Sequence, residues 1–135
     1  MKTKFGLLII SIALLACCQM SASAQAPAIK KGMIRVAILY PNAEGSTFNM
    51  EYYATKHIPL IKKLFGDAMK GASIDKGIAS GTPGASVPYL AVGYLYFDNV
   101  AAFSEGMKIH AAAIRVDIPN YTNIKPVVQI SEVVE

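Results

Sequence analysis

The sequence predicts an α+β domain in which a four-stranded antiparallel sheet carries two helices on one face. Four segments are rich in β-branched and aromatic residues, and two longer segments have apolar residues at spacings of three and four. The order of these segments along the chain is β-α-β-β-α-β, which is the split βαβ, or ferredoxin-like, arrangement. We expect this single domain to span residues 33–135.

The first strand is predicted over residues 33–40, MIRVAILY, which are apolar and β-branched and stop at Pro41. After a polar loop, a helix is predicted from about Asn49 to Phe65, and Gly66 then provides a stop signal. Its apolar face consists of residues three or four apart, which lie on one side of a helix: Met50, Tyr53, His57, Ile61 and Leu64.

Four further elements complete the order. A weaker strand over residues 69–79 is interrupted by Gly71 and Gly77, and a loop leads to a strand over residues 89–97. Asp98 is a suitable N-cap for a second helix to about Val116, and the last strand covers residues 127–134. The apolar face of the second helix contains Phe103, Met107, His110 and Ile114.

The strand over residues 89–97 is apolar on both of its faces. Leu90, Val92, Tyr94 and Tyr96 point to one side of the sheet, and Ala91, Gly93, Leu95 and Phe97 point to the other. Two helices cover only one face, and a monomer rarely leaves a large apolar face open to water. We therefore expect a homodimer through the sheet face. The alternative is that the helices and loops of one chain cover enough of the sheet.

The first 24 residues are predicted to be a signal peptide. Two lysines precede an apolar run that is too short to span a bilayer, and Ala22-Ser23-Ala24 offers small residues at the cleavage positions. Cleavage after Ala24 leaves a flexible leader over residues 25–32 and a secreted or periplasmic protein without either cysteine. In the alternative, Cys17 is lipidated and places the protein on a membrane.

Charge and motifs argue against several classes of protein. The formal net charge of +4 includes two lysines of the predicted signal peptide. The positive charge that remains after cleavage is too small to indicate binding to nucleic acid. The chain has no dinucleotide motif, phosphate loop, serine-nucleophile motif or haem attachment motif. Two histidines and an aspartate contain the ligand types of a two-His-one-carboxylate metal site, but no close ligand pair exists. We expect no cofactor and no metal.

The two histidines, His57 and His110, are candidate catalytic residues. Each is predicted on the apolar face of a different helix, and both helices turn to the same side of the sheet. A neutral imidazole can act as a general base or donate a hydrogen bond to a substrate oxygen, and the alternative for each is an ordinary core residue. Pro59 predicts a kink or restart beside His57, which either fits the helix to the sheet or opens a cleft.

The chain's seven tyrosines combine apolar rings with hydroxyl groups, which suits a cleft for an aromatic or polyketide-like ligand. The alternative for each tyrosine is packing in the core or in an interface. The candidates for lining such a cleft are Tyr40, Tyr53, Tyr94, Tyr96 and Tyr121.

Three stretches of the chain resemble the EthD family, named for ethyl tert-butyl ether degradation: YPNAEGSTFNMEYYATKHIPL, GDAMKGASIDKGIASGTPGASVPYLAVGYLYFDNVAAF and HAAAIRVDIPNYTNIKPVVQISEV. The likeness covers residues 34–133 and implies a ferredoxin-like subunit in a dimeric α+β barrel. His57 in KHIPL, His110 in HAAAI, and Asp117 and Tyr121 in DIPNYT match the family pattern. Members are often labelled reductases, but export would separate this chain from cytosolic NAD(P)H and reduced flavin.

Two functions follow as hypotheses. The first is a cofactor-independent enzyme of the oxidoreductase or cyclase type that acts on a small aromatic or carbonyl compound. His57 and His110 are its expected catalytic residues, and the expected substrate-binding residues are Tyr40, Tyr53, Tyr94, Asp117 and Tyr121. The second is a non-catalytic binding or stress protein that sequesters a small apolar ligand outside the cytoplasm.

Overall fold

The computed structural model describes residues 28–135. The predicted signal peptide, its cleavage site and Cys17 lie outside the described residues. Within residues 28–135, none of the helices combines the length and the apolar character that a membrane span requires.

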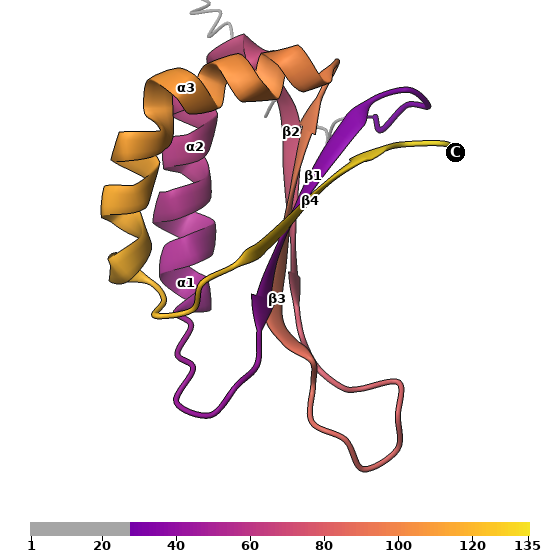
Figure 1. The fold of residues 1–135 in the computed structure, drawn as a ribbon, viewed down its shortest axis with the longest axis vertical. Coiled ribbons are helices and arrows are strands. Elements are labelled where there is room, and N and C mark those ends of the chain that lie inside the picture. The colour runs from indigo at the N-terminus through magenta and orange to yellow at the C-terminus, as the bar shows by residue number, and fades with distance from the viewer. Residues whose placement is uncertain (1–27) are drawn as a thin grey trace, which may run out of the picture.

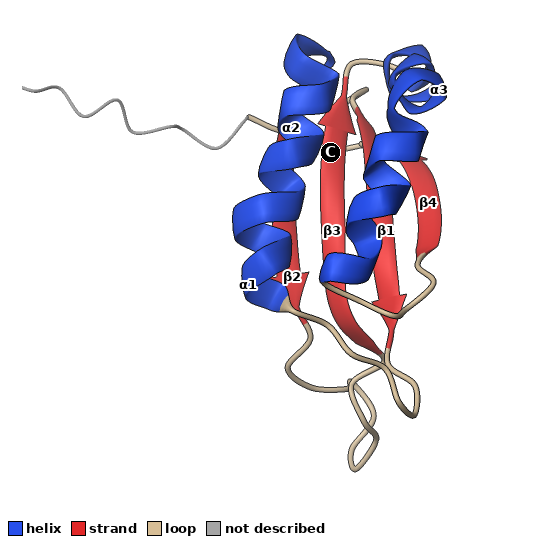
Figure 2. Cartoon of the chain, turned by 90° about the vertical axis from the view of Figure 1, so that its left-hand side faces the viewer, coloured by secondary structure: helices blue, strands red, loops and turns tan. Residues whose placement is uncertain are grey.

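The sheet contains four antiparallel strands in the order β2-β3-β1-β4. Both helical segments lie on the same face of this sheet, and the other face carries no helix (Figures 1 and 2). The ferredoxin-like α+β class and the β-α-β-β-α-β order are therefore confirmed. The strands are β1 (Ile34–Pro41), β2 (Met69–Lys76), β3 (Tyr89–Phe97) and β4 (Val127–Glu132).

The first helical segment contains a wide turn in its middle. It runs as α1 (Met50–Tyr52), a π-helical turn (Tyr53–His57) and α2 (Ile58–Phe65). The N–H of Ile58 bonds the carbonyl of Tyr53, five residues back, and Pro59 falls in the first turn of α2, where its missing N–H costs little. The predicted irregularity beside His57 is therefore present as a π turn followed by a restart of the α-helix.

The second helix, α3 (Val100–Asp117), corrects one sequence prediction. Its N-cap is Asn99, whose side chain accepts the N–H of Ala102, and Asp98 is not the cap. Asp98 instead forms an exposed ion pair with Lys70 at 3.1 Å. The two adjacent residues are both good capping types, so local preference alone did not distinguish them. Strands β2 and β4 also end earlier than predicted, at Lys76 and Glu132.

The main core lies between the helices and the sheet. It contains Phe65 from α2, Val36 from β1 and Phe97 from β3, together with Ile61, Met69 and Leu95. Full burial of one such side chain stabilises the fold by roughly 1.5–3 kcal/mol. A separate small cluster contains Met33, Tyr96 and Val133, with Tyr94 packed against it. Since Tyr94 and Tyr96 alternate with the core residues Leu95 and Phe97, this cluster lies on the sheet face without helices.

Candidate functional site

Two loops that lie far apart in the sequence meet beside the N-terminal end of the first helical segment. Asn49 caps α1 by accepting the N–H of Tyr52, and its own N–H donates to the carbonyl of Tyr121 at 2.7 Å. Phe48 and Thr122 form an isolated antiparallel bridge. These bonds hold the start of the first helix against the segment that follows α3, and they bring His57 and Asp117 to the same place.

A chain of side-chain hydrogen bonds runs through this place. The Nδ1 atom of His57 lies 2.7 Å from Oδ2 of Asp117, and its Nε2 atom lies 3.3 Å from the hydroxyl of Tyr121. That hydroxyl lies 2.9 Å from the hydroxyl of Tyr40. Because an ionised carboxylate only accepts, Nδ1 of His57 donates to Asp117 and Nε2 of the neutral ring is the acceptor. Tyr121 then donates to His57, and Tyr40 donates to Tyr121.

Asp117 is held by two further side chains. The hydroxyl of Tyr52 donates to its Oδ1 atom at 2.8 Å, and the amide of Asn120 donates to the same oxygen at 3.1 Å. Asn120 also donates to the hydroxyl of Tyr52 at 3.1 Å. The carboxylate is thus fixed on both oxygens, which orients the imidazole of His57 through its Nδ1 atom.

Burial controls the charge of this group of side chains. It lowers the pKa of His57 below its ordinary value of 6.5, and the hydrogen bond and charge of Asp117 oppose this only in part. For Asp117 itself, burial raises the pKa, but the bonds from His57, Tyr52 and Asn120 outweigh it and the pKa falls. Burial raises the pKa of both Tyr40 and Tyr121. At neutral pH the site therefore holds an ionised Asp117, a neutral His57 and protonated tyrosines.

The tyrosines pack edge to face around Phe48. Tyr40, Tyr53 and Tyr121 all have ring centroids within 5.5 Å of the Phe48 centroid. Tyr53 is 1% exposed, and its hydroxyl lies against the backbone of Gly93 in β3. A Cβ atom at position 93 would collide with that hydroxyl, so the close approach of Tyr53 requires a glycine there.

A cavity of about 170 Å³ lies between the helices and the sheet beside this group. Tyr40, Tyr53, His57 and Tyr121 line its polar part. The other lining side chains, Arg115 excepted, are apolar and come from β1, β3, α2, α3 and the segment around Val128. A cavity with an apolar wall and a few convergent polar groups is the usual form of a small-molecule site.

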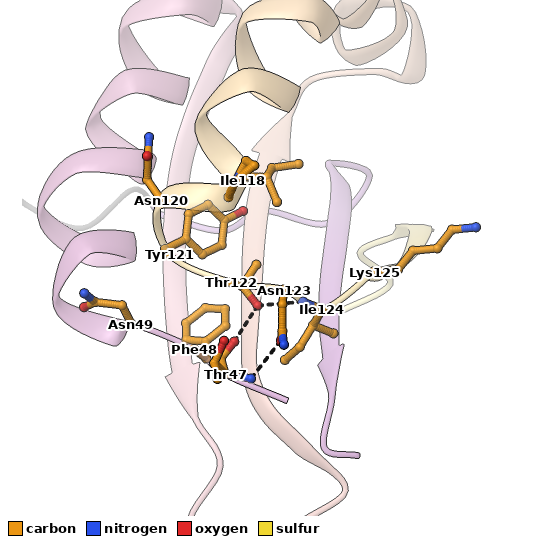
Figure 3. Close-up of a pocket in the computed structure, with 11 residues that line it drawn as sticks. Thr47, Phe48, Asn49, Ile118, Asn120, Tyr121, Thr122, Asn123, Ile124 and Lys125 are labelled. Carbon is orange, nitrogen blue, oxygen red and sulfur yellow. Dashed lines mark hydrogen bonds between the residues drawn. The ribbon is translucent and has the colours of Figure 1, made fainter. Parts of the chain in front are cut away.

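A larger hollow of about 750 Å³ lies at the surface between the two loops (Figure 3). Several of its polar atoms are engaged in bonds between the loops. Asn123 Oδ1 accepts the N–H of Thr47, and Thr122 donates to the Thr47 carbonyl, as the dashed lines show. Because these bonds build the loop junction, and because His57 lines the smaller cavity, we place the candidate site in the smaller cavity.

The structure brings together five of the seven predicted site residues: Tyr40, Tyr53, His57, Asp117 and Tyr121. Tyr94 is not among them, because strand alternation puts it on the opposite sheet face, where Arg35 lies 5.5 Å from its ring centre. His110 does not join the hydrogen-bonded chain either. Its ring lies 6.1 Å from Phe65, two turns beyond His57 on the first helical segment, and His110 does not line the cavity.

Sequence reasoning missed Tyr52 and Asn120, which fix Asp117. A weak signal for Asn120 exists, since it follows Asp117 by three residues and the two share one helical turn. Among residues 28–135, no three His, Cys, Asp or Glu side chains gather in a way that could hold a metal ion. The two-His-one-carboxylate set fails because His57 meets Asp117 while His110 packs against Phe65.

Comparison with known proteins gives a consistent result. Residues 46–125 match the family model of the EthD domain. The fold is similar to that of an EthD-like protein from Ralstonia eutropha JMP134, with 40% sequence identity, a TM-score of 0.74, and coverage of 78% of this chain and 96% of that one. An ethyl tert-butyl ether (EthD) family protein from Bacillus halodurans C-125 has the same fold at 17% identity and a TM-score of 0.51, covering 75% and 98%. No protein of curated function matches the chain.

Proposed function

Because the chain belongs to the EthD family, we propose that it acts on a small aromatic or carbonyl compound bound in the cavity beside His57. The observation that supports this most directly is the Asp117–His57–Tyr121 hydrogen-bond chain, which reaches the wall of a largely apolar cavity. Family membership alone does not specify a reaction, so the chemistry of the site carries the proposal.

The proposed step is proton transfer from an activated C–H bond. Nε2 of His57 accepts the proton, the electron pair moves to the neighbouring carbonyl, and the hydroxyl of Tyr121 turns to stabilise the resulting enolate oxygen. Asp117 holds the ring in the tautomer that leaves Nε2 unprotonated, so Nε2 can accept the proton once the Tyr121 hydroxyl turns away, and Asp117 stabilises the imidazolium that forms. Return of the proton to another atom of the enolate completes an isomerisation, and no cofactor enters the step.

The test is hydrogen–deuterium exchange of 1-phenyl-1,3-butanedione in D₂O, followed by NMR. We expect exchange above the buffer rate with the wild-type protein and a loss of about 10²-fold or more in His57→Gln, since glutamine keeps hydrogen-bonding capacity but is not a base. His110→Gln is the second arm; because His110 lies outside the cavity lining, we expect it to keep the exchange. A folded His57→Gln variant with wild-type exchange would overturn the proposal.

The second candidate function is ligand sequestration without turnover, and the apolar character of most of the cavity lining favours it. In that case phenol would bind, as NMR shifts of Tyr53 and Tyr121 would report, while the protein would not accelerate exchange of the diketone. Binding without acceleration therefore selects sequestration, and binding with acceleration selects the enzyme.

We also propose that the mature protein is exported and forms a homodimer through the sheet face without helices. The support for export is the sequence of residues 1–24, and the support for the dimer is the apolar outer face of β3, on which Val92 and Tyr94 are only half-buried. N-terminal sequencing of the exported protein should begin at Gln25. A lipid-modified Cys17 would instead place the protein on a membrane.

A further inference from the structure

Among residues 28–135, Arg115 is the only Asp, Glu, Lys or Arg side chain that lines the cavity beside His57. It lies in the last turn of α3, and the residue as a whole is exposed to solvent although it lines the cavity. Its neighbours in the cavity lining are apolar and include Ala111, Ile114 and Ile118. A single permanent positive charge therefore borders an otherwise uncharged and mainly apolar space.

This guanidinium has no partner within residues 28–135. The ion pairs there join His57 to Asp117, Lys70 to Asp98 and Lys108 to Glu105, and none includes Arg115. Asp117 is only two residues away, but both of its oxygens are bonded to His57, Tyr52 and Asn120. By contrast, Arg35, the other arginine of the chain, lies over the ring of Tyr94. Arg115 is thus free to bind an anion.

The wall beside Arg115 is also incompletely covered. Val128 lines the same cavity from the edge strand β4, yet it is 52% exposed, because neither helix lies over that strand (Figure 2). A ligand with an apolar body would bury such surface, and the planar fork of an arginine matches a carboxylate with two parallel hydrogen bonds.

We propose that Arg115 determines specificity and that the cavity takes an amphipathic anion: an aromatic carboxylate with its ring among the apolar side chains and its carboxylate on the guanidinium. This inference rests on the proposed function, because it names the substrate class of the same cavity. In the competing explanation, the aliphatic part of the Arg115 side chain covers apolar surface, and its guanidinium is solvated by water and binds no ligand.

The experiment compares two probes of nearly equal shape, 3-phenylpropanoate and its neutral amide, 3-phenylpropanamide. Their dissociation constants are measured by calorimetry at pH 7.5 in low salt. We expect the wild-type protein to bind the carboxylate about fivefold more tightly than the amide, the range for a solvent-exposed ion pair. Arg115→Met, which keeps an apolar stem, should bring the ratio to about one without weakening the amide, and Arg115→Lys should retain part of the preference.

The ratio should also fall as salt is added, since exposed charges are screened. Lys56→Met, which removes an exposed lysine outside the cavity lining, is the matched control and should keep the wild-type ratio. Equal affinities of the two probes for the wild-type protein, or an unchanged ratio in Arg115→Met, would overturn this inference and leave the cavity as a ligand site. Failure of both probes to bind would overturn the inference and the proposed function together.

Discussion

At the scale of single residues, His57 is held between two opposing effects. Burial of His57, a residue that is 5% exposed, disfavours the protonated form of its ring, while the carboxylate of Asp117 favours it. Burial is the larger effect, so the pKa of His57 is lowered. A neutral imidazole with a fixed tautomer can accept a proton at neutral pH, and the same balance links the stability of the fold to pH.

The first prediction concerns this linkage. Because the folded-state pKa of His57 is below its ordinary value of 6.5, the unfolded chain binds more protons than the folded one in mildly acidic solution. The contribution of His57 is fully present above pH 6.5 and is lost as the pH falls toward the lowered value. We expect urea unfolding to show a free energy that drops between pH 7.5 and 5, by at most about 1.4 kcal/mol per pH unit from this group.

His57→Gln should flatten this dependence, and the exposed Lys56→Gln should not. The lowered pKa of Asp117 adds a second loss of stability in the same direction, at pH values below its ordinary value of 3.8. An unfolding free energy that rises between pH 7.5 and 5 would contradict the assignment of a buried, neutral His57.

The second prediction concerns Gly93. A Cβ atom there would collide with the Tyr53 hydroxyl and would lie 3.2 Å from its Cζ atom. Gly93→Ala should therefore destabilise the protein by about 1–3 kcal/mol through overpacking. In Tyr53→Phe the hydroxyl is absent, so adding Gly93→Ala to it should cost clearly less than adding it to the wild type. Chemical denaturation of the four proteins measures this coupling.

Gly81→Ala is the matched control, because nothing lies within 4 Å of a Cβ atom at that loop position. Additive effects of Gly93→Ala and Tyr53→Phe would show that the two residues do not constrain each other.

At the scale of elements, the π-helical turn Tyr53–His57 sets the directions of the side chains on either side of it. Five residues occupy this wide turn, and Tyr53 and His57 at its two ends are both buried, with their rings stacked 5.4 Å apart. π turns are single-turn features that are frequently found at functional sites. In this protein the turn orients the side chain of Tyr53 toward Gly93 and that of His57 toward Asp117.

The third prediction tests this turn by removing one residue. Deletion of the exposed Ala54 would shorten the turn to an ordinary α-helical one in which Tyr53 and His57 are three residues apart, so the angle between these two side chains around the helix axis changes. We expect the variant to lose the Tyr53–Gly93 contact and the diketone exchange and to melt at a lower temperature than wild type. Ala54→Ser, which keeps the length, should change neither. Wild-type exchange in the deletion variant would show that the wide turn is dispensable.

At the scale of the whole molecule, the sheet face without helices remains to be covered. Tyr94 and Tyr96 lie on this face with Met33 and Val133, and Val92 precedes them on the same side of β3. Met33, Tyr96 and Val133 are already buried within one chain, whereas Val92 and Tyr94 are only half-buried, and a second copy of the same face would cover these two, which is the physical basis of the proposed homodimer.

The fourth prediction is the assembly itself. Sedimentation of the mature chain at micromolar concentration should give a dimer, and Val92→Lys should shift it toward monomer by placing a charge in the apolar interface. Ile109→Lys is the matched control, because Ile109 is 72% exposed on α3 at the helical side of the molecule. A wild-type monomer, or dissociation caused equally by both variants, would contradict an interface through the sheet.

The sequence by itself determined the element order, the two-sided apolar strand and the presence of His57, Tyr53 and Ile61 on one helical face, because periods of two and 3.6 residues are local properties of the chain.

Only the tertiary structure decided which distant residues meet. His57 and Asp117 are 60 residues apart and touch through the junction of two loops. His110 lies on the predicted face of its helix but packs against Phe65 and not beside His57. Periodicity predicts which face of a helix a residue occupies, but it does not predict which residue of a neighbouring helix lies opposite. Tyr94 turned away from the site for the same reason: alternation defines two faces of a strand, and packing of the helices selects one of them.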